Sequence, residues 1–166
     1  HKAVLNRYLG YRDGLRSLGL KFDRRLVRQG DNAFESGSRC ARGLLELSDP
    51  PTAIFASNDD MAAGVMQVAH EMGLSIPGDL SVAGFDDVPL ASYIWPSLTT
   101  IRQPIEEMAV RATALLLSQL RDGDPDTIEH TIDSELVIRA STGVPAGKRP
   151  RAAAGTTARG RPRASR

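Results

Sequence analysis

Cysteine, aromatic residues and long apolar runs are all scarce in this chain. The single cysteine, Cys40, excludes an internal disulfide framework and a multi-cysteine zinc site, so a reduced, cytoplasmic setting is expected. No apolar run approaches the roughly 20 residues that span a bilayer, and no membrane partner is expected. Residues 1–7 lack the charged and apolar regions of a signal peptide, so nothing in them directs export.

Acidic residues are missing from the C-terminal end, so the near-zero net charge of the whole sequence does not describe the remaining residues. Seven of the 21 Lys and Arg residues lie in residues 147–166, which contain no Asp or Glu. Residues 1–146 therefore carry 14 basic against 20 acidic residues, a net charge of −6. This mildly acidic part lacks the excess of basic residues that is typical of a nucleic-acid-binding domain. Residues 147–166 are predicted to be a disordered basic tail, with weak non-specific attraction to nucleic acid as the alternative.

Motifs of common catalytic and cofactor sites are also lacking. The chain has no G-x-x-x-x-G-K-[ST] or G-x-G-x-x-G phosphate loop and no G-x-S-x-G elbow. The carboxylate pairs at 59–60 and 86–87 would suit a metal-dependent phosphoryl-transfer site, but no lysine is placed to neutralise the phosphate. The histidines are scattered without ligand spacing. We therefore predict no catalytic residue, no metal ligand and no cofactor, and the chain is not expected to be an enzyme.

What the chain does contain is an alternation of apolar patterns with helical and strand periods. The patterns predict helices over residues 3–18, 35–47, 59–72 and 104–120, and extended strands over 26–29, 52–57, 80–85 and 98–103. Residues 127–139 alternate in two stretches, consistent with paired or kinked strands. Strands alternating with helices predict an α/β fold in which helices flank a parallel sheet on both faces.

Polar residues follow two of these strands at the point where each strand ends. Residues 52–57 stop at Asn58-Asp59-Asp60, and residues 80–85 stop at Asp86-Asp87. A helix lies between the two strands, so the unit is strand–helix–strand. Because ligands of open parallel sheets bind outside the carboxyl ends of the strands, these side chains indicate a small polar ligand.

Two stretches carry a resemblance to a known family. One is Arg7-Tyr8-Leu9-Gly10-Tyr11, and the other is the run from Pro50 to Pro104. Together they closely resemble the effector-binding core of the LacI/GalR family of bacterial transcriptional repressors, over about residues 6–143. The resemblance implies a partial, periplasmic-binding-protein-like type I lobe. Residues 1–146 would form most of the C-terminal lobe, and residues 104–122 would cross into the N-terminal lobe.

The resemblance also implies a function and partners. Family members bind a sugar or nucleobase-like effector between two lobes, and the effector alters the operator affinity of a helix-turn-helix head. That head is absent from this chain, which starts inside a predicted helix, so a fragment of a ligand-responsive repressor is expected. A homodimer formed through the core is also expected. The alternative is a solute-binding protein of a transport system, which shares the two-lobe fold.

Three residues align with the family's ligand contacts, namely Arg7, Asn58 and Asp86. Their chemistry suits a polyhydroxylated ligand, because a guanidinium only donates, a carboxylate only accepts and an amide does both. Each has a structural alternative. Asn58 and Asp59 could be only an N-cap pair; we expect Asp59 to be the cap and Asn58 the contact. Asp86 is expected to face the cleft while Asp87 holds the loop.

Three further residues are weaker candidates for the ligand site. Many relatives place an aromatic ring directly after the Gly-Asp that corresponds to residues 30–31, but here Asn32 follows. Either Phe34 reaches in, or hydrogen bonds hold the ligand more than stacking does. Phe85 either lines the cleft or belongs to the core. Gln103 either reaches the ligand or only stabilises the crossing between the lobes.

Overall fold

The computed structural model describes residues 2–122 and 131–144. The predicted tail at 147–166, and residues 127–130 of the last predicted strands, lie outside this range, so the division into 1–146 and 147–166 stays a prediction. The elements are α1 (Lys2–Ser17), the 3₁₀ helix η1 (Arg24–Leu26), α2 (Phe34–Leu45), β1 (Ala53–Phe55), α3 (Asp59–Glu71), β2 (Ser81–Ala83), α4 (Pro89–Tyr93), β3 (Thr100–Arg102), α5 (Ile105–Asp122) and β4 (Glu135–Val137).

The strands have a parallel centre and an antiparallel return. β1 and β2 run parallel, with Ile54 opposite Val82. Beyond β2, the parallel ladder continues onto the β3 segment, where Gly84 N–H donates to the Thr99 carbonyl over 2.9 Å. β4 then pairs with β3 in the antiparallel direction. Parallel neighbours bring successive carboxyl ends to one edge, as the sequence predicts.

Helices α2 and α3 form one layer against the strands, where the apolar core lies. The largest fully buried apolar side chains are Leu80, Leu98, Val68 and Val82. The two helices approach so closely that a Cβ on Gly37 would lie 2.3 Å from the Met61 carbonyl oxygen, and one on Gly64 would lie 2.3 Å from that of Phe34. Glycine at both positions therefore permits the contact between the helix backbones.

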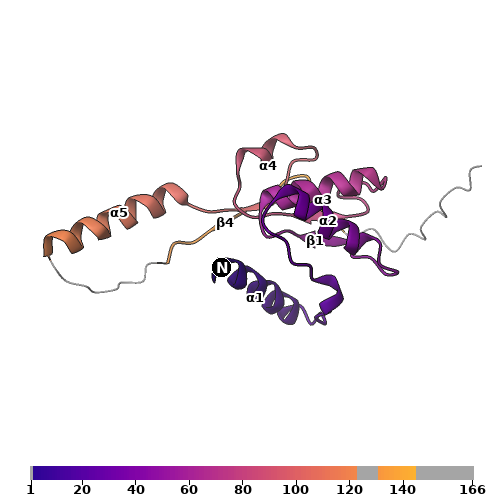
Figure 1. The fold of residues 1–166 in the computed structure, drawn as a ribbon, viewed down its shortest axis with the longest axis horizontal. Coiled ribbons are helices and arrows are strands. Elements are labelled where there is room, and N and C mark those ends of the chain that lie inside the picture. The colour runs from indigo at the N-terminus through magenta and orange to yellow at the C-terminus, as the bar shows by residue number, and fades with distance from the viewer. Residues whose placement is uncertain (1, 123–130, 145–166) are drawn as a thin grey trace, which may run out of the picture.

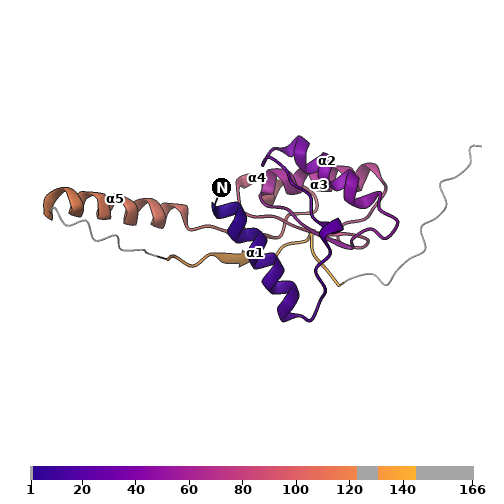
Figure 2. The same ribbon diagram turned by 60° about the horizontal axis from the view of Figure 1, so that its bottom comes forward.

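Helices α1 and α5 lie apart from this layer. α1 lies on the opposite side of the strands from α2 and α3, as Figures 1 and 2 show, and none of its residues is buried. α5 extends away from the body on the segments that contain β3 and β4 (Figure 1). It is amphipathic as predicted, and Ile105, Leu116 and Leu120 of its apolar set are exposed in the described structure. None of the helices within residues 2–122 and 131–144 combines the length and apolarity needed to cross a membrane.

The predicted strand at 26–29 is wrong. Its first residue, Leu26, ends η1, and the following residues form no strand. The reason is local: the Asp23 carboxylate accepts a 2.8 Å hydrogen bond from the Arg25 backbone N–H and pairs with its guanidinium at 2.7 Å. These bonds close a turn where an extended backbone was expected. α4 lies between the predicted strands at 80–85 and 98–103, where no helix was predicted, and it begins at Pro89, a favoured first helical residue.

Candidate functional site

Arg7 of α1 meets the loop after β2 at the carboxyl ends of the strands. Its Nη2 lies 3.4 Å from Oδ1 of Asp86, and its Nη1 donates to the Ser57 carbonyl over 2.5 Å. The guanidinium carbon stands 3.8 Å from the centroid of the Phe85 ring. The Arg7 and Asp86 side chains remain 17% and 30% exposed. A cation stacked on an aromatic face and tied at two nitrogens is fixed in place while its other donors stay accessible.

Gln103, between β3 and α5, also contacts Asp86. Its Nε2 donates to Oδ1 of Asp86 over 2.7 Å. Both nitrogen contacts of this carboxylate fall on Oδ1, and among the described residues no hydrogen bond reaches Oδ2. Asp86 also has a positive φ of 117°, which is uncommon for a residue with a side chain. The site therefore presents one carboxylate oxygen with unused acceptor capacity, held in an unusual backbone conformation.

The roles expected for Asn58 and Asp59 at the start of α3 need a correction. Asn58, not Asp59, is the N-cap: its backbone is extended and its Oδ1 accepts from the Met61 N–H over 3.0 Å. Its Nδ2 donates to the Asn32 carbonyl over 2.9 Å. Asn58 thus lies beside Ser57, the partner of Arg7, but both ends of its amide are already used. Its role as an effector contact stays a prediction.

Asp59 points inward and supports the loop that carries Asp86. It is 1% exposed, its Oδ1 accepts from the Thr100 hydroxyl over 2.6 Å, and its Oδ2 accepts from the Val88 N–H over 3.0 Å. Burial raises the pKa of the Asp59 carboxyl above its ordinary value, although both hydrogen bonds favour the charged form. A Cβ on Gly84 would lie 2.3 Å from Oδ1 of Asp59, so only glycine fits there.

Asp87 holds the loop, as expected. Its side chain is 6% exposed, with Arg139 Nη2 at 2.6 Å from Oδ1 and Arg102 Nε at 2.7 Å from Oδ2. Burial alone would raise the pKa of Asp87, but the hydrogen bonds and charges of the two arginines outweigh it and lower the pKa below its ordinary value. This carboxylate is fully engaged by the protein.

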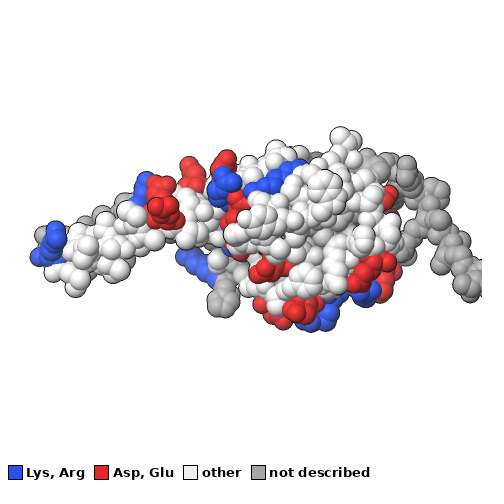
Figure 3. All heavy atoms as spheres, turned by 90° about the horizontal axis from the view of Figure 1, so that it is seen from above, with Lys and Arg blue, Asp and Glu red and all other residues white. Residues whose placement is uncertain are grey.

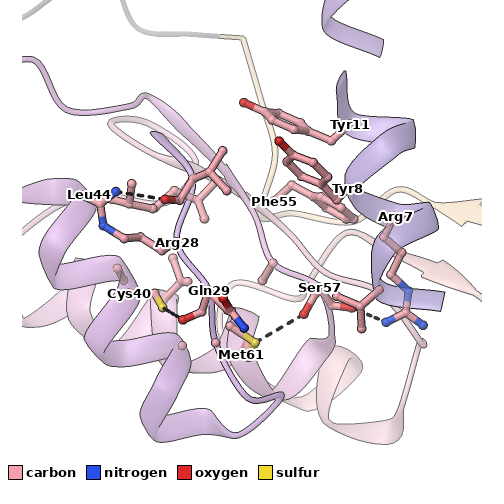
Figure 4. A pocket seen from close by; sticks show the side chains of 18 of the residues that line it. Arg7, Tyr8, Tyr11, Arg28, Gln29, Cys40, Leu44, Phe55, Ser57 and Met61 are labelled. Carbon is pink, nitrogen blue, oxygen red and sulfur yellow. Dashed lines mark hydrogen bonds between the residues drawn. The ribbon is translucent and has the colours of Figure 1, made fainter. Parts of the chain in front are cut away.

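We call Arg7, Phe85, Asp86 and Gln103 the Arg7 cluster. A cavity of about 780 Å³ lies next to it, between α1 and β1 (Figure 4). Tyr8 and Tyr11 of α1 lie on one side of it and Phe55 of β1 faces them. Arg7 lines this cavity, whereas Asn58, Asp86, Phe85, Gln103 and Phe34 do not. Phe34, at the start of α2, is 38% exposed, and among the described residues its ring makes no aromatic or cation–π contact with Arg7 or Phe85. The structure thus brings together Arg7, Phe85, Asp86 and Gln103.

The sequence did not reveal two residues at the cluster's edge. Ser57 offers its carbonyl to Arg7, and its hydroxyl donates to Oδ1 of Asn32 over 3.2 Å. Asn32 has a φ of 67°, in the left-handed region that asparagine tolerates. Asn32 follows Gly30-Asp31, where the family resemblance implied an aromatic ring, and this difference was the signal in the sequence that could have pointed to it.

Comparisons with known proteins place this arrangement in a family. Residues 2–142 match the family model of the periplasmic binding protein-like domain. The chain is 41% identical over 136 residues to the HTH-type transcriptional repressor CytR of Escherichia coli K12, covering 82% of this chain and 40% of that protein. It is 35% identical over 140 residues to the probable HTH-type transcriptional repressor ExuR of Bacillus subtilis, covering 84% and 42%. The chain therefore spans less than half the length of these relatives.

Solved structures agree with the sequence relatives. The complex of the transcriptional regulator CelR with cellobiose aligns with a TM-score of 0.79 at 30% identity, covering 82% of this chain and 42% of the other. A LacI family transcriptional regulator from Enterococcus faecium with bound ribose aligns with a TM-score of 0.76 at 30% identity, covering 84% and 51%. The chain belongs to the LacI/GalR family of transcriptional regulators, as part of their periplasmic-binding-protein-like effector-binding core.

Proposed function

We propose that this chain is the ligand-sensing part of a LacI-type regulator and that it binds a small sugar-like effector. Effector binding would change the operator affinity of a helix-turn-helix head that lies outside this sequence. A ligand changes such an equilibrium only by binding two conformations with different affinity. The regulator acts in the cytoplasm, where its operator lies, and it performs no enzymatic reaction.

The observation that carries the proposal is the arrangement around Asp86. Oδ1 of this carboxylate is held by Gln103 and faces Arg7, while Oδ2 is left to accept from a ligand. Arg7 is oriented by the Ser57 carbonyl and the Phe85 ring. Adjacent hydroxyls of a sugar could donate to Oδ2 and accept from the guanidinium. A ligand without hydroxyls would cover Oδ2 of Asp86 without donating to it, so the site should bind such a ligand more weakly.

The effector class follows from this chemistry and from relatives. The structural neighbours named above were solved with cellobiose and with ribose. In this chain Asn32 bonds to Ser57 and Asn58, at the position where the family resemblance implied an aromatic ring. We therefore assign hydrogen bonds rather than stacking as the main source of affinity. Relatives named as repressors favour this reading over a solute-binding protein of a transporter.

A homodimer and operator DNA are the proposed macromolecular partners. Tyr93 and Trp95, at and after the end of α4, are 83% and 92% exposed, and large aromatic side chains of this kind are enriched at interfaces. On the face shown in Figure 3, the described acidic and basic side chains are interspersed and form no broad basic area. Contact with DNA is therefore assigned to the helix-turn-helix head and not to this face.

Titration of the ¹⁵N-labelled chain with D-ribose, cellobiose and a nucleoside, followed by NMR, tests the proposal. At least one ligand should shift the amide signals of residues 84–87. Asp86→Asn should weaken binding about 10- to 100-fold, because a hydrogen bond to a charged group is worth about 1.5–3 kcal/mol. Asp13→Asn, in an exposed ion pair on α1, is the matched control and should bind as the parent does. Equal binding by the parent and Asp86→Asn would refute the assignment.

A further inference from the structure

One nearly buried carboxylate in the described structure accepts from two arginines and is not used by the effector site. Asp87 is almost buried, and each of its oxygens takes one arginine: Oδ1 accepts from Arg139 Nη2 at 2.6 Å, and Oδ2 accepts from Arg102 Nε at 2.7 Å. Charge-assisted bonds this short are among the strongest in proteins. A loop that only needed closing would not require two arginines from other segments.

The two arginines come from the two segments that join α5 to the body. Arg102 is the last residue of β3, which leads into α5, and Arg139 lies two residues beyond β4, which returns from it. Figure 1 shows α5 extending from the body on these two segments alone. We call Asp87, Arg102 and Arg139 the crossing clamp.

Further bonds make the crossing clamp rigid. Arg102 Nη1 donates to Oε2 of Glu135 on β4 over 3.0 Å, so β3 and β4 are tied by side chains as well as by their ladder. Arg139 Nη1 donates to the Leu98 carbonyl over 2.8 Å. A displacement of either segment therefore moves a partner of Asp87.

Asp87 shares a peptide unit with Asp86, and this connects the crossing clamp to the effector site. Both residues have positive φ, 117° for Asp86 and 57° for Asp87. Such conformations are costly for residues with side chains and persist only when surrounding contacts impose them. The contacts here come from the crossing segments: the Asp86 N–H donates to the Ile101 carbonyl over 2.9 Å, and Gln103 donates to its carboxylate.

We propose that Asp87 is a positioning residue that couples the effector site to the crossing between the lobes. The inference rests on the proposed function, because it assigns a route by which effector binding at Asp86 alters the segments flanking α5. An effector hydroxyl that donates to Oδ2 of Asp86 draws this carboxylate toward the ligand and shifts the loop. Asp87 transmits that shift to Arg102 and Arg139. The crossing clamp holds the loop in the conformation that presents Asp86, so loosening the clamp weakens effector binding. Because coupling between sites is reciprocal, effector binding in turn stabilises that conformation of the clamp.

Three variants of the full chain, together with the rescue variant Arg102→Lys, test the crossing clamp without an effector. Arg102→Gln removes a half-exposed partner and should leave the fold intact, Asp87→Asn removes the centre, and Arg111→Gln breaks an exposed pair with Glu107 on α5 and serves as control. We expect the Arg7 Nε–Hε signal to move in the first two variants, although Arg7 contacts neither residue in the described structure. Amide hydrogen exchange at residues 135–137 should become about 10-fold faster, the equivalent of one lost charge-assisted bond. Arg102→Lys should restore part of both effects.

A purely structural role for Asp87 predicts a different pattern. It would lower the unfolding free energy while leaving the Arg7 signal of folded Arg102→Gln where the parent has it, and that result overturns the proposal. Titration with D-ribose distinguishes a failure of the proposed function from a failure of the coupling. If the parent shows no response to ribose or other sugars, the proposed function fails, while the Arg7 signal still decides the coupling. If the parent binds, Arg102→Gln should bind at least about 5-fold more weakly, the lower limit of typical coupling; unchanged affinity overturns the coupling.

Discussion

Nε2 of Gln103 donates to Oδ1 of Asp86 over 2.7 Å, which ties the segment leading into α5 to the loop after β2. The two residues are 17 positions apart, and their side chains are partly buried. A neutral amide thus stabilises a carboxylate that also faces Arg7. Replacing Gln103 with glutamate, which has the same size but accepts where the amide donates, tests this hydrogen bond separately from packing.

Gln103→Glu should lower the unfolding free energy by about 1 kcal/mol at pH 7, since a second carboxylate replaces the donor and the remaining exposure of Asp86 screens the repulsion. Below about pH 4 the introduced glutamic acid is protonated and donates again, so the difference from the parent should shrink. Urea denaturation at both pH values measures this change. Gln119→Glu, on the exposed side of α5, is the control. A deficit of the same size at both pH values would contradict the role of the donor.

Gly84→Ala should destabilise the protein by about 1–3 kcal/mol, because the new Cβ would lie 2.3 Å from Oδ1 of Asp59 and 2.9 Å from Cδ2 of Leu98. Gly10→Ala is the matched control: nothing lies within 4 Å of its Cβ position in α1, and alanine favours a helix by about 1 kcal/mol. The urea midpoint should therefore fall for the first variant and hold or rise for the second. An unchanged midpoint for Gly84→Ala would show that Asp59 can move aside at little cost.

Much of the fold could be predicted because it depends on local patterns. Apolar periodicity placed α1, α2, α3 and α5 to within a few residues, and apolar runs stopped by polar residues placed β1 and β2. The strand predicted at 26–29 failed for two reasons: the hydrogen bonds of Asp23 to Arg25 close a turn that ends at Leu26, and residues 27–29 pair with no neighbouring strand among the described residues.

The site was less predictable, because its contacts join distant positions. Arg7 meets partners 50 and 79 residues away, so only the family resemblance pointed to it. Asn58 and Asp59 are both good capping residues, and Thr100, 41 residues beyond Asp59, decides which one turns inward. Asp87 could be assigned to the loop, but its two arginine partners could not be derived from spacing.

Trp95→Lys should reduce self-association of the chain. Trp95 and Tyr93 are 92% and 83% exposed, and a dimer that covers them loses apolar contact and gains a buried charge when one becomes lysine. Sedimentation equilibrium should show that the association constant of the dimer falls by about 10-fold or more, the typical effect of removing a central aromatic side chain from an interface. Leu18→Lys, directly after the last residue of α1 and 74% exposed, is the control for loss of an exposed apolar side chain. Equal weakening by both variants would place the interface elsewhere.

The buried Asp59 carboxyl gives the protein a pH dependence opposite in sign to that of Asp87. Burial raises the pKa of Asp59 above its ordinary value of 3.8, so between 3.8 and the raised pKa the native state binds more protons than the unfolded state. The stability contributed by protonated Asp59 is thus fully present below 3.8 and is lost as the pH rises through the folded pKa. Asp87, whose pKa is lowered, contributes stability that is present above 3.8 and lost as the pH falls through its folded pKa.

Asp59→Asn separates the two effects, because asparagine does not titrate and its amide can still accept from the Val88 N–H. The unfolding free energy of the parent minus that of Asp59→Asn should decrease between pH 3.8 and the raised pKa of folded Asp59, by at most about 1.4 kcal/mol per pH unit, and should be level below and above this interval. Urea titrations at several pH values measure the difference. Asp60→Asn, exposed in the same first turn of α3, reports the loss of one helix-end charge without buried contacts. A difference that rises with pH for Asp59→Asn would mean that Thr100 and Val88 stabilise the carboxylate by more than its burial costs.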